Sequence, residues 1–251
     1  MIEKEFYEKV ANWDFSQIKY ETIKKTKWDF YEEISKYTNE NSLCLDLGTG
    51  GGEKILAMYP EVRMVSGTDF SSKMIQTANT NLAGSKRNDV RFVQMNNLKL
   101  KFPNSLFDVV TARHTVINAC ELYRVLKPKG IVIIQGVDKD DCLQLKKIFS
   151  RGQAFNDEKA ISQIDYENLI NSGFEIIKKV KIDEEEYYKT KEDLLALLLK
   201  TPILDDFSNS ENNYNKIPIE QNLLDSYIKN NKLQKGIKLN RLLYGIVAQK
   251  K

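Results

Sequence analysis

The chain has 251 residues, of which 41% are hydrophobic and 29% charged, and its formal net charge is only +3. This length suffices for one large α/β domain with additions, or barely for two small domains. Lysines interleaved with acidic residues do not favour a nucleic-acid binder, in which basic residues would be clustered, although they do not exclude one. The three cysteines are far apart and there is a single histidine, which excludes the usual zinc spacings and argues against a disulfide framework, so no metal is expected.

The first 40 residues combine charged sequence with scattered aromatic residues, among them both tryptophans of the chain. We expect residues 1–40 to be helical and to form an N-terminal lid. The charged start, Met1 to Phe6, lacks the apolar core of a signal peptide, and no segment approaches the roughly 20 apolar residues of a membrane span. These features predict a cytoplasmic protein without a membrane span.

From residue 42 onward, strand and helix patterns alternate, which is typical of a parallel sheet. Strands are expected at 42–47, 62–69, 90–95, 107–112, 131–135, 174–182 and 238–249. Helices are expected at 52–59, from about 73, and at 116–126, 138–150 and 164–171. The alternation predicts an α/β fold with a Rossmann-like, seven-stranded, mostly parallel sheet and helices on both faces.

Neither internal repeats nor low-complexity linkers interrupt the chain, which predicts a single domain over residues 1–251. Its core is expected to comprise 41–188 and 237–251. Between the last two strands, 189–236 holds two further helical patterns, at 191–200 and at about 220–229. We predict that this helical insertion forms a substrate cap.

The most informative segment is Leu43–Gly52, in which an apolar strand runs into an acidic residue and then into alternating glycines. Glycine adopts left-handed dihedrals and lets the backbone approach a ligand closely. Nucleotide sites of doubly wound sheets lie at such a turn. A dinucleotide fingerprint would need its third glycine at Glu53. Asp46 would repel a pyrophosphate but suits a cation, such as the ammonium of a methionine moiety.

This acid-glycine pattern resembles the first motif of class I S-adenosylmethionine-dependent methyltransferases. Similarity to the menaquinone- and ubiquinone-methylase branch extends over residues 42–182 and the final strand. Within it, Leu122–Gly130 resembles the family's leucine-lysine-proline-glycine-glycine turn, with Lys129 replacing one glycine. The resemblance implies S-adenosylmethionine as cofactor, S-adenosylhomocysteine as product, and cofactor contacts at Asp46, Gly48, Thr49, Gly50 and Gly52.

The resemblance also assigns the adenosine half of the cofactor. Asp69 lies 23 residues after Asp46 and would accept both ribose hydroxyls, as the corresponding acid does in dinucleotide folds. Alternatively, Asp69 only caps the next helix. Phe70 and Met74 would lie against the adenine, although Met74 suits a core position equally well.

Three further positions follow the expected strand 90–95. Asn96 stands where the family often has aspartate beside the adenine amino group, and its amide oxygen can still accept that hydrogen bond. Asn97 and Leu98 would supply backbone contacts nearby. These roles are implied by the resemblance alone.

Residues just after the expected strand 107–112 reach the methyl position in this fold, and here they include Arg113 and His114. The unperturbed pKa of histidine suits a general base near neutrality, but His114 equally suits a hydrogen bond to backbone or packing under the lid. Arg113 is expected to bind a substrate anion or an acidic side chain. Tyr20 and Trp28 are candidate substrate-binding residues, because aromatic faces hold planar or cationic groups; simple packing on the sheet is the alternative.

We expect an S-adenosylmethionine-dependent methyltransferase that acts on a small-molecule acceptor by in-line displacement. An Asn/Asp-Pro-Pro-aromatic segment and a Pro-Cys nucleophile are both missing, which counts against methylation of adenine or cytosine in nucleic acid. The alternatives are a ribosomal or transfer RNA methyltransferase, a non-catalytic S-adenosylmethionine-binding partner protein and, most distantly, an NAD-dependent oxidoreductase. The acceptor, and whether the protein is a monomer or a homodimer, stay open.

Overall fold

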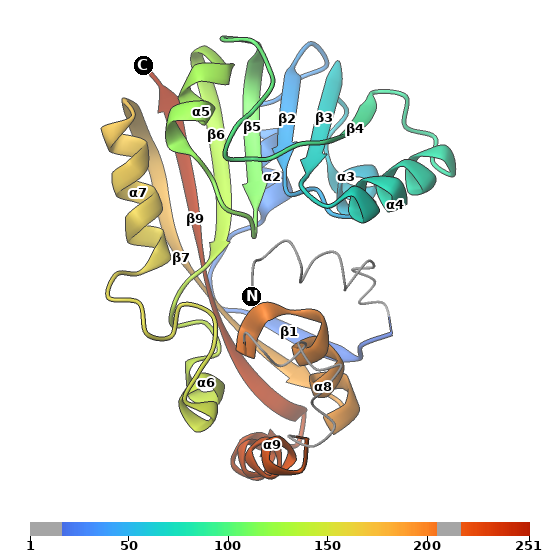
Figure 1. The fold of residues 1–251 in the computed structure, drawn as a ribbon, viewed down its shortest axis with the longest axis vertical. Helices are drawn as coiled ribbons and strands as arrows, with labels where there is room; N and C mark the ends of the chain where they lie inside the picture. Colours follow the sequence, from blue (N-terminus) through green and yellow to red (C-terminus); the bar gives the residue numbers. More distant parts are fainter. Residues whose placement is uncertain (1–16, 205–216) are drawn as a thin grey trace. The chain divides into compact units, whose positions relative to one another are not determined.

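The structure is a computed structural model that describes residues 17–204 and 217–251. Its strands are β1 (Tyr20–Lys24), β2 (Leu43–Leu47), β3 (Met64–Asp69), β4 (Val90–Gln94), β5 (Phe107–Arg113), β6 (Leu126–Val137), β7 (Phe174–Tyr188), β8 (Lys232–Leu233) and β9 (Gly236–Lys250). Its helices are α2 (Phe30–Ser35), α3 (Glu53–Met58), α4 (Ser72–Ala83), α5 (Ala119–Val125), α6 (Leu143–Phe149), α7 (Ile161–Asn171), α8 (Lys191–Lys200) and α9 (Ile217–Asn231). The strands pair in the order β1-β7-β9-β6-β5-β2-β3-β4, and β8 pairs with β9 (Figure 1).

The chain divides into two compact units. The larger unit comprises residues 28–137, 161–181 and 244–251. The described part of the smaller unit comprises residues 17–27, 138–160, 182–204 and 217–243. The long strands β7 and β9 contribute residues to both units.

The described sheet has nine strands, so the expected count of seven is wrong. All seven expected strands are present, as β2 to β7 and β9, and β1 and β8 are additional. The expectation of a helical segment through residue 40 is also wrong for Tyr20–Lys24, which forms β1; residues 1–16 of that lid lie outside the described residues. The physical reason is that β7 continues beyond residue 182 and offers an edge, on which Tyr20 pairs with Tyr188 in antiparallel register.

In the larger unit, β2 pairs in parallel with β3 and β5, while β4 and β6 extend the sheet on either side. Alternate side chains of a strand point to opposite faces. Leu45 and Leu47 of β2 accordingly pack with Leu122 of α5 and Leu169 of α7 on one face. The intervening Asp46 belongs to the opposite face. β2 and β5 are mostly apolar and buried along most of their length, as is usual for parallel strands covered on both sides.

That opposite face carries polar side chains in neighbouring strands at matched positions. Asp46 of β2 is in register with Thr111 of β5, and Arg113 of β5 with Gln135 of β6. The Tyr59 hydroxyl, just after α3, lies 3.5 Å from the Thr111 hydroxyl oxygen. Helices or their flanking residues thus cover both faces of the sheet, as the sequence predicts. A row of polar side chains lies on the face that carries Asp46, beneath the residues that follow α3.

The smaller unit has its own apolar core, made by α6, α8, α9 and parts of the strands. Arg241 of β9 pairs with Asp141 at 2.9 Å and with Glu186 at 3.1 Å. The helices expected at 191–200 and 220–229 are present as α8 and α9, while 205–216 of the insertion lie outside the described residues. The division into one domain with a lid and a substrate cap stays a prediction.

No helix among the residues that the structure describes is long and apolar enough to cross a membrane. Likewise, within residues 17–204 and 217–251, no three His, Cys, Asp or Glu side chains gather in a way that could hold a metal ion. Cys44 and Cys142 are buried and Cys120 is exposed, and all three are free thiols.

Candidate functional site

The direction of the strand order changes at β2. From β2 the chain continues to β3 and β4 on one side, then returns to add β5 and β6 on the other. In open parallel sheets, ligands bind outside the carboxyl ends of the strands at such a switch point. Asp46 is the last but one residue of β2, Asp69 the last of β3, and Arg113 the last of β5. The predicted site residues therefore converge on the place where this fold binds ligands.

The glycine turn after β2 has the backbone conformation that its sequence predicts. Gly48, Gly50 and Gly52 have φ angles of +70°, +57° and +78°, in the left-handed region that favours glycine. A Cβ atom on Gly48 would lie 2.6 Å from the Thr115 Cβ, and one on Gly52 would lie 2.5 Å from the Phe92 Cζ. The turn is thus a cradle of bare backbone that side chains from β4 and the loop after β5 enclose.

Gly48→Ala is expected to destabilise the protein by about 2–4 kcal/mol, since a left-handed alanine costs about 1–2 kcal/mol and the contact with Thr115 adds overpacking strain. Gly84→Ala is the matched control, because Gly84 has a φ of −84° and its added Cβ would meet nothing closer than 3.6 Å. Denaturant unfolding of both variants measures the difference. Equal midpoints for the two variants would contradict the described turn.

Asp46 is almost fully buried, at 7% exposure, and its Oδ1 accepts a hydrogen bond of 2.6 Å from the Thr111 hydroxyl. Burial raises the pKa of Asp46 to about 7. The Thr111 hydrogen bond and the positive charge of Arg113 favour the ionised form and only partly offset this rise. The carboxyl is thus near its titration point at neutral pH. Sequence reasoning missed Thr111, although a threonine inside the apolar run of β5 was a usable signal.

Thr49 lies in the turn beside this carboxyl. Among the buried side-chain nitrogen and oxygen atoms of the described residues, its hydroxyl oxygen is the one without a partner in full hydrogen-bond geometry. The Thr49 hydroxyl is still close enough to Asp46 to act as a weak donor, which lowers the pKa of that carboxyl. Buried polar groups are normally paired, so an unpaired one calls for an explanation such as a ligand. Thr49 and Asp46 together offer oxygen acceptors to a cationic donor.

Asp69 joins the glycine turn to α4. Its Oδ2 accepts the Gly50 N–H at 3.0 Å, and its Oδ1 accepts the Ser71 N–H at 2.9 Å. Burial raises the pKa of Asp69, and these two N–H groups oppose the shift. The N-cap of α4 is Ser71, whose hydroxyl accepts the Met74 N–H, so capping is not the role of Asp69. Each Asp69 oxygen keeps acceptor capacity for a further hydroxyl.

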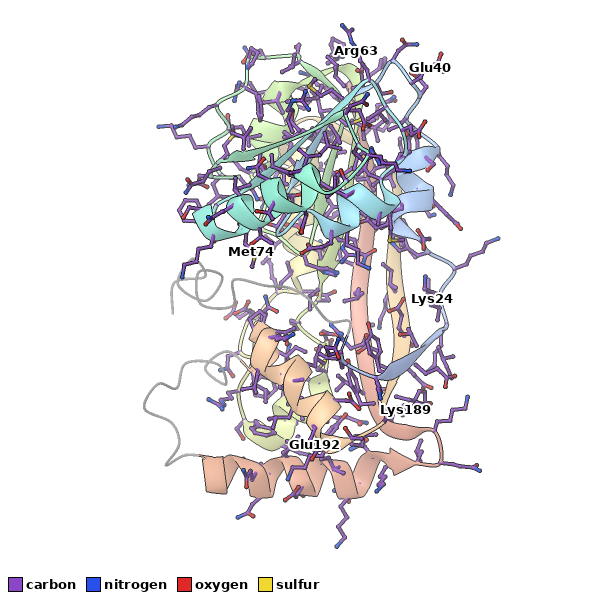
Figure 2. The ribbon with its side chains drawn as sticks, turned by 90° about the vertical axis from the view of Figure 1, so that its right-hand side faces the viewer. Lys24, Glu40, Arg63, Met74, Lys189 and Glu192 are labelled. Atoms are coloured by element: carbon purple, nitrogen blue, oxygen red, sulfur yellow. The ribbon has the colours of Figure 1, made fainter. Side chains whose placement is uncertain are left out.

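The residues assigned to adenine differ in their exposure. Phe70 and Leu98 are exposed, at 43% and 47%. Met74, which lies on α4 (Figure 2), is only 1% exposed. Asn96 is exposed, and its Oδ1 accepts the Leu98 N–H at 2.8 Å. Met74 therefore has the surroundings of a core residue, while Phe70 and Leu98 leave apolar surface at the ends of β3 and β4. Their contacts with adenine stay predictions.

Asn97 acts through its side chain, where only backbone contacts were expected. It is buried, its Oδ1 accepts from the Thr68 hydroxyl at 3.2 Å, and its Nδ2 donates to the Thr115 hydroxyl at 3.1 Å. The Thr68 hydroxyl also contacts the Asp46 carbonyl oxygen at 3.2 Å. Asn97 thus ties the carboxyl end of β3 to the loop after β5, and it supports the turn from behind.

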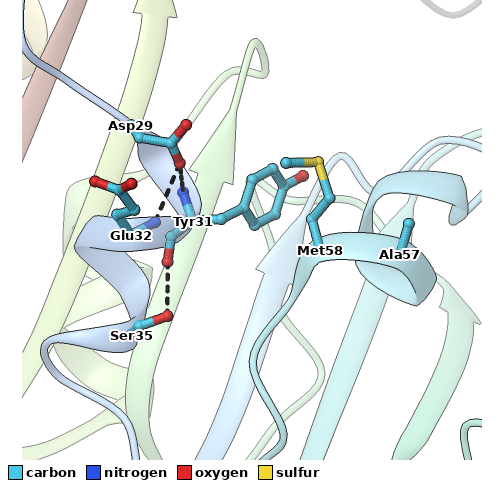
Figure 3. A pocket seen from close by; sticks show the side chains of 6 residues that line it. All are labelled: Asp29, Tyr31, Glu32, Ser35, Ala57 and Met58. Carbon is cyan, nitrogen blue, oxygen red and sulfur yellow. Dashed lines mark hydrogen bonds between the residues drawn. The ribbon is translucent and has the colours of Figure 1, made fainter.

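An open pocket of about 390 Å³ lies between α2 and α3, on the face of the sheet that carries Asp46. Figure 3 shows the Tyr31 ring and the Met58 side chain pointing toward each other across it. Burial raises the pKa of Tyr31, and the charge of Arg113 opposes the shift. Arg113, half-buried, thus interacts electrostatically with both Tyr31 and Asp46. The lining residues are Asp29, Tyr31, Glu32, Ser35, Ala57 and Met58.

His114 follows Arg113 in a strained conformation, with a φ of +54°. Its backbone N–H donates to the Gln135 carbonyl oxygen at 2.8 Å, and its Nε2 lies 3.4 Å from the Gln135 Nε2. Trp28 donates from Nε1 to the Gln135 Oε1 at 2.8 Å. A non-glycine residue with positive φ at a strand end is a hint of function. Sequence reasoning missed Gln135, which reaches His114 only through the pairing of β5 with β6.

The two candidate substrate-binding aromatics have different surroundings. Trp28 belongs to the larger unit and is only 5% exposed, with its N–H bonded to Gln135. Tyr20 belongs to the smaller unit, is 44% exposed, and stacks on Tyr188 with ring centroids 5.2 Å apart. Their role in binding substrate stays a prediction.

Known proteins share the segment that carries this site. Residues 45–134 match the family model described as "Methyltransferase domain". The demethylmenaquinone methyltransferase of Lactococcus lactis is 33% identical over 99 residues, which are 36% of this chain and 39% of that protein. The uncharacterized methyltransferase YcgJ of Bacillus subtilis is 29% identical over 91 residues, 36% of each chain. This chain thus matches little more than a third of the length of these curated relatives.

Solved structures share the fold over a longer stretch. The YcgJ crystal structure has a TM-score of 0.57 at 18% identity, and the match covers 88% of this chain and 97% of that one. The [4+2]-cyclase SpnF has a TM-score of 0.54 at 15% identity, with 88% and 80% covered. These structural likenesses show the fold, while residues 45–134 are similar to the methyltransferase domain of S-adenosylmethionine-dependent methyltransferases, among them those that act on demethylmenaquinone. The cofactor of that class is S-adenosylmethionine.

The described residues fit this cofactor. The glycine cradle admits backbone contacts, the unpaired Thr49 hydroxyl and the buried Asp46 carboxyl suit an ammonium, and Asp69 has acceptor capacity for hydroxyls. All of these groups lie at the carboxyl ends of β2 and β3.

Proposed function

We propose that the protein is an S-adenosylmethionine-dependent methyltransferase that acts on a small-molecule acceptor. The observation that carries the proposal is the bare glycine turn at the switch point, beside which Asp46 of β2 and Arg113 of β5 belong to one face of the sheet. An α-amino acid group carries the complementary pair, an ammonium and a carboxylate. The unpaired Thr49 hydroxyl adds an acceptor for the same ammonium.

In this proposal each residue holds one part of the cofactor. Asp46 and Thr49 bind the ammonium of its methionine moiety, and Arg113 pairs with the carboxylate. Asp69 accepts the ribose hydroxyls while its bonds to Gly50 and Ser71 keep it aligned. Phe70, Leu98 and Asn96 border the adenine.

The bound cofactor supplies a methyl group that its sulfonium has already activated for displacement. The chain must then hold the acceptor in line, and such positioning is able to contribute several kcal/mol of the barrier. Arg113 ends β5, and His114 and Thr115 follow it beside the glycine turn, as the close approach of Thr115 to Gly48 indicates. They are the residues we propose for contact with the acceptor.

A small-molecule acceptor is supported by the names of the curated relatives, several of which are quinone methyltransferases. Methylation of ribosomal or transfer RNA is the second candidate within this chemistry. A cofactor-binding protein without methyl transfer is the third, and the SpnF likeness shows that this fold also occurs in a protein named a cyclase.

Calorimetric titration of the purified chain with S-adenosylmethionine and S-adenosylhomocysteine tests the proposal. We expect both to bind at one site per chain. Radiolabelled methyl transfer to a panel of small aromatic, amine and carboxylate acceptors, and to total RNA, then separates the candidates. Failure of both cofactor forms to bind would refute the proposal, and binding without transfer to any acceptor would favour the cofactor-binding protein.

A further inference from the structure

The side chains of Trp28, Gln135 and His114 contact one another in a row. Trp28, at one end of this row, fixes the direction of its hydrogen bonds. An indole N–H donates and never accepts. Trp28 Nε1 lies 2.8 Å from the Gln135 Oε1, so the amide oxygen must face the indole. The amide nitrogen of Gln135 therefore faces the other way, toward His114.

The amide nitrogen is also a pure donor, and the His114 Nε2 lies 3.4 Å from it. At this long distance the hydrogen bond is weak. A proton on the His114 Nε2 would nevertheless face the N–H of the Gln135 amide, so that two donors would point at each other. A lone pair on Nε2 removes that conflict. A neutral imidazole with its lone pair on Nε2 carries its proton on Nδ1. We propose that Trp28 and Gln135 hold His114 in this Nδ1-protonated tautomer.

Turning the Gln135 amide over would not release the ring cheaply. It would place the amide nitrogen against the Trp28 N–H, and Trp28 is only 5% exposed, so a buried donor would lose its partner. The Trp28 ring is also held in place, because a Cβ on Gly245 would lie 2.6 Å from it and Lys178 Nζ lies 4.9 Å from its centroid. The Gln135 carbonyl oxygen in turn accepts the His114 N–H at 2.8 Å.

The consequence for the reaction rests on the proposed function. With the lone pair of Nε2 directed at Gln135, that nitrogen of His114 is not placed to take a proton from an acceptor molecule. Trp28 and Gln135 are positioning residues that set the protonation of His114, and removal of a substrate proton falls to another group or is not needed.

The single histidine of the chain makes the tautomer directly measurable. The full chain, made without a histidine tag and labelled with ¹⁵N-histidine, gives one pair of ring nitrogens in a long-range ¹H–¹⁵N correlation spectrum. Well above the ordinary histidine pKa of about 6.5, we expect a protonated Nδ1 and an unprotonated Nε2. In Gln135→Glu the facing group becomes an acceptor, so Nε2 is expected to gain a proton. Trp28→Phe frees the amide to turn and should shift the population the same way.

The matched control is Gln249→Glu, because the Gln249 side chain contacts the Lys129 carbonyl oxygen. Lys129 lies about six residues, or about 20 Å, from Gln135 along β6. Gln249→Glu is expected to leave the tautomer unchanged. A wild-type ring protonated on Nε2, or an unprotonated Nε2 in Gln135→Glu, would overturn the proposal. Gln135→Glu keeps the side-chain size, so the test stands even where Trp28→Phe fails to fold. The spectra are recorded without cofactor, so their outcome is independent of methyl transfer.

Discussion

Asp69→Ala is expected to weaken binding of S-adenosylmethionine by about 10²–10⁴-fold. The carboxylate would lose two charge-assisted hydrogen bonds to the ribose, each worth about 1.5–3 kcal/mol, and every 1.4 kcal/mol corresponds to a factor of ten in affinity. The Gly50 and Ser71 N–H groups would lose their common acceptor as well, so the turn itself would loosen. Isothermal titration of the wild type and the variant measures the effect.

The control for this prediction is Asp108→Ala, at the other end of the same sheet. Asp108 accepts the Leu43 N–H at 2.8 Å and pairs with Lys127 at 2.8 Å, near the amino ends of β2 and β5. Its loss should lower stability but leave cofactor affinity within about threefold, since its partners lie away from the switch point. If both alanine variants weakened binding equally, general destabilisation would explain the result and the ribose role of Asp69 would be wrong.

The affinity for S-adenosylmethionine is expected to fall as the pH is lowered through 7, by up to about tenfold per pH unit. Burial raises the pKa of Asp46 to about 7, so below this pH the unliganded carboxyl is mostly protonated. Pairing with an ammonium requires the ionised form, and the proton must then be released. Titrations across this pH range test the slope. Asp46→Asn should bind weakly with no such slope, and a slope that survives in the variant would rule out Asp46 as its origin.

The Asp46 carboxyl affects folding stability in the opposite direction: lowering the pH weakens cofactor binding but stabilises the folded chain. Because the Asp46 pKa is about 7 in the folded chain and about 3.9 in an unfolded one, the folded state binds more protons between these values. The contribution of Asp46 to stability is therefore fully present at low pH and is lost as the pH rises toward 7. Asp46→Asn is expected to raise the free energy of unfolding at pH 8 by up to about 4 kcal/mol, from three pKa units at 1.36 kcal/mol each.

Asp89→Asn supplies the comparison for folding. Its carboxylate pairs with Arg87 at 2.7 Å, and this hydrogen bond lowers the pKa of Asp89. Its contribution is present above the unfolded pKa and lost as the pH falls, so Asp89→Asn should destabilise the protein at pH 8. Denaturant unfolding of both variants at pH 8 measures whether each substitution raises or lowers the free energy of unfolding. If Asp46→Asn lowered it, the raised pKa of the buried Asp46 carboxyl would be contradicted.

The local parts of the fold were predictable from the sequence, and the non-local parts were not. The seven expected strands have clear apolar patterns of their own, and the helix expected from about residue 73 is present as α4. Residues 20–24 were expected to be helical, but they form β1. They become a strand only because β7 extends to Tyr188 and offers them an edge. A strand without its own apolar pattern depends on its partner, and that partner lies far along the chain.

The candidate site divides in the same way. The positions of Asp46, Asp69 and the glycines were predictable, because each lies within a few residues of a strand end. The contacts of Thr111 with Asp46 and of Gln135 with His114 were not, because they depend on the parallel register of β2, β5 and β6. Tyr31 carries no sequence signal and gains its place from the packing of α2.

The sequence by itself determined the glycine turn and the two strand-end carboxylates of the proposed cofactor site, because they form a local pattern. Only the tertiary structure decided the chemical state of the groups around it. Burial beside Thr111 and Arg113 sets the protonation of Asp46, and the hydrogen bonds from Trp28 to Gln135 and onward set the surroundings of His114. Protonation depends on burial and on neighbouring charges and donors, and these are contributed by strands and helices that are distant in the sequence.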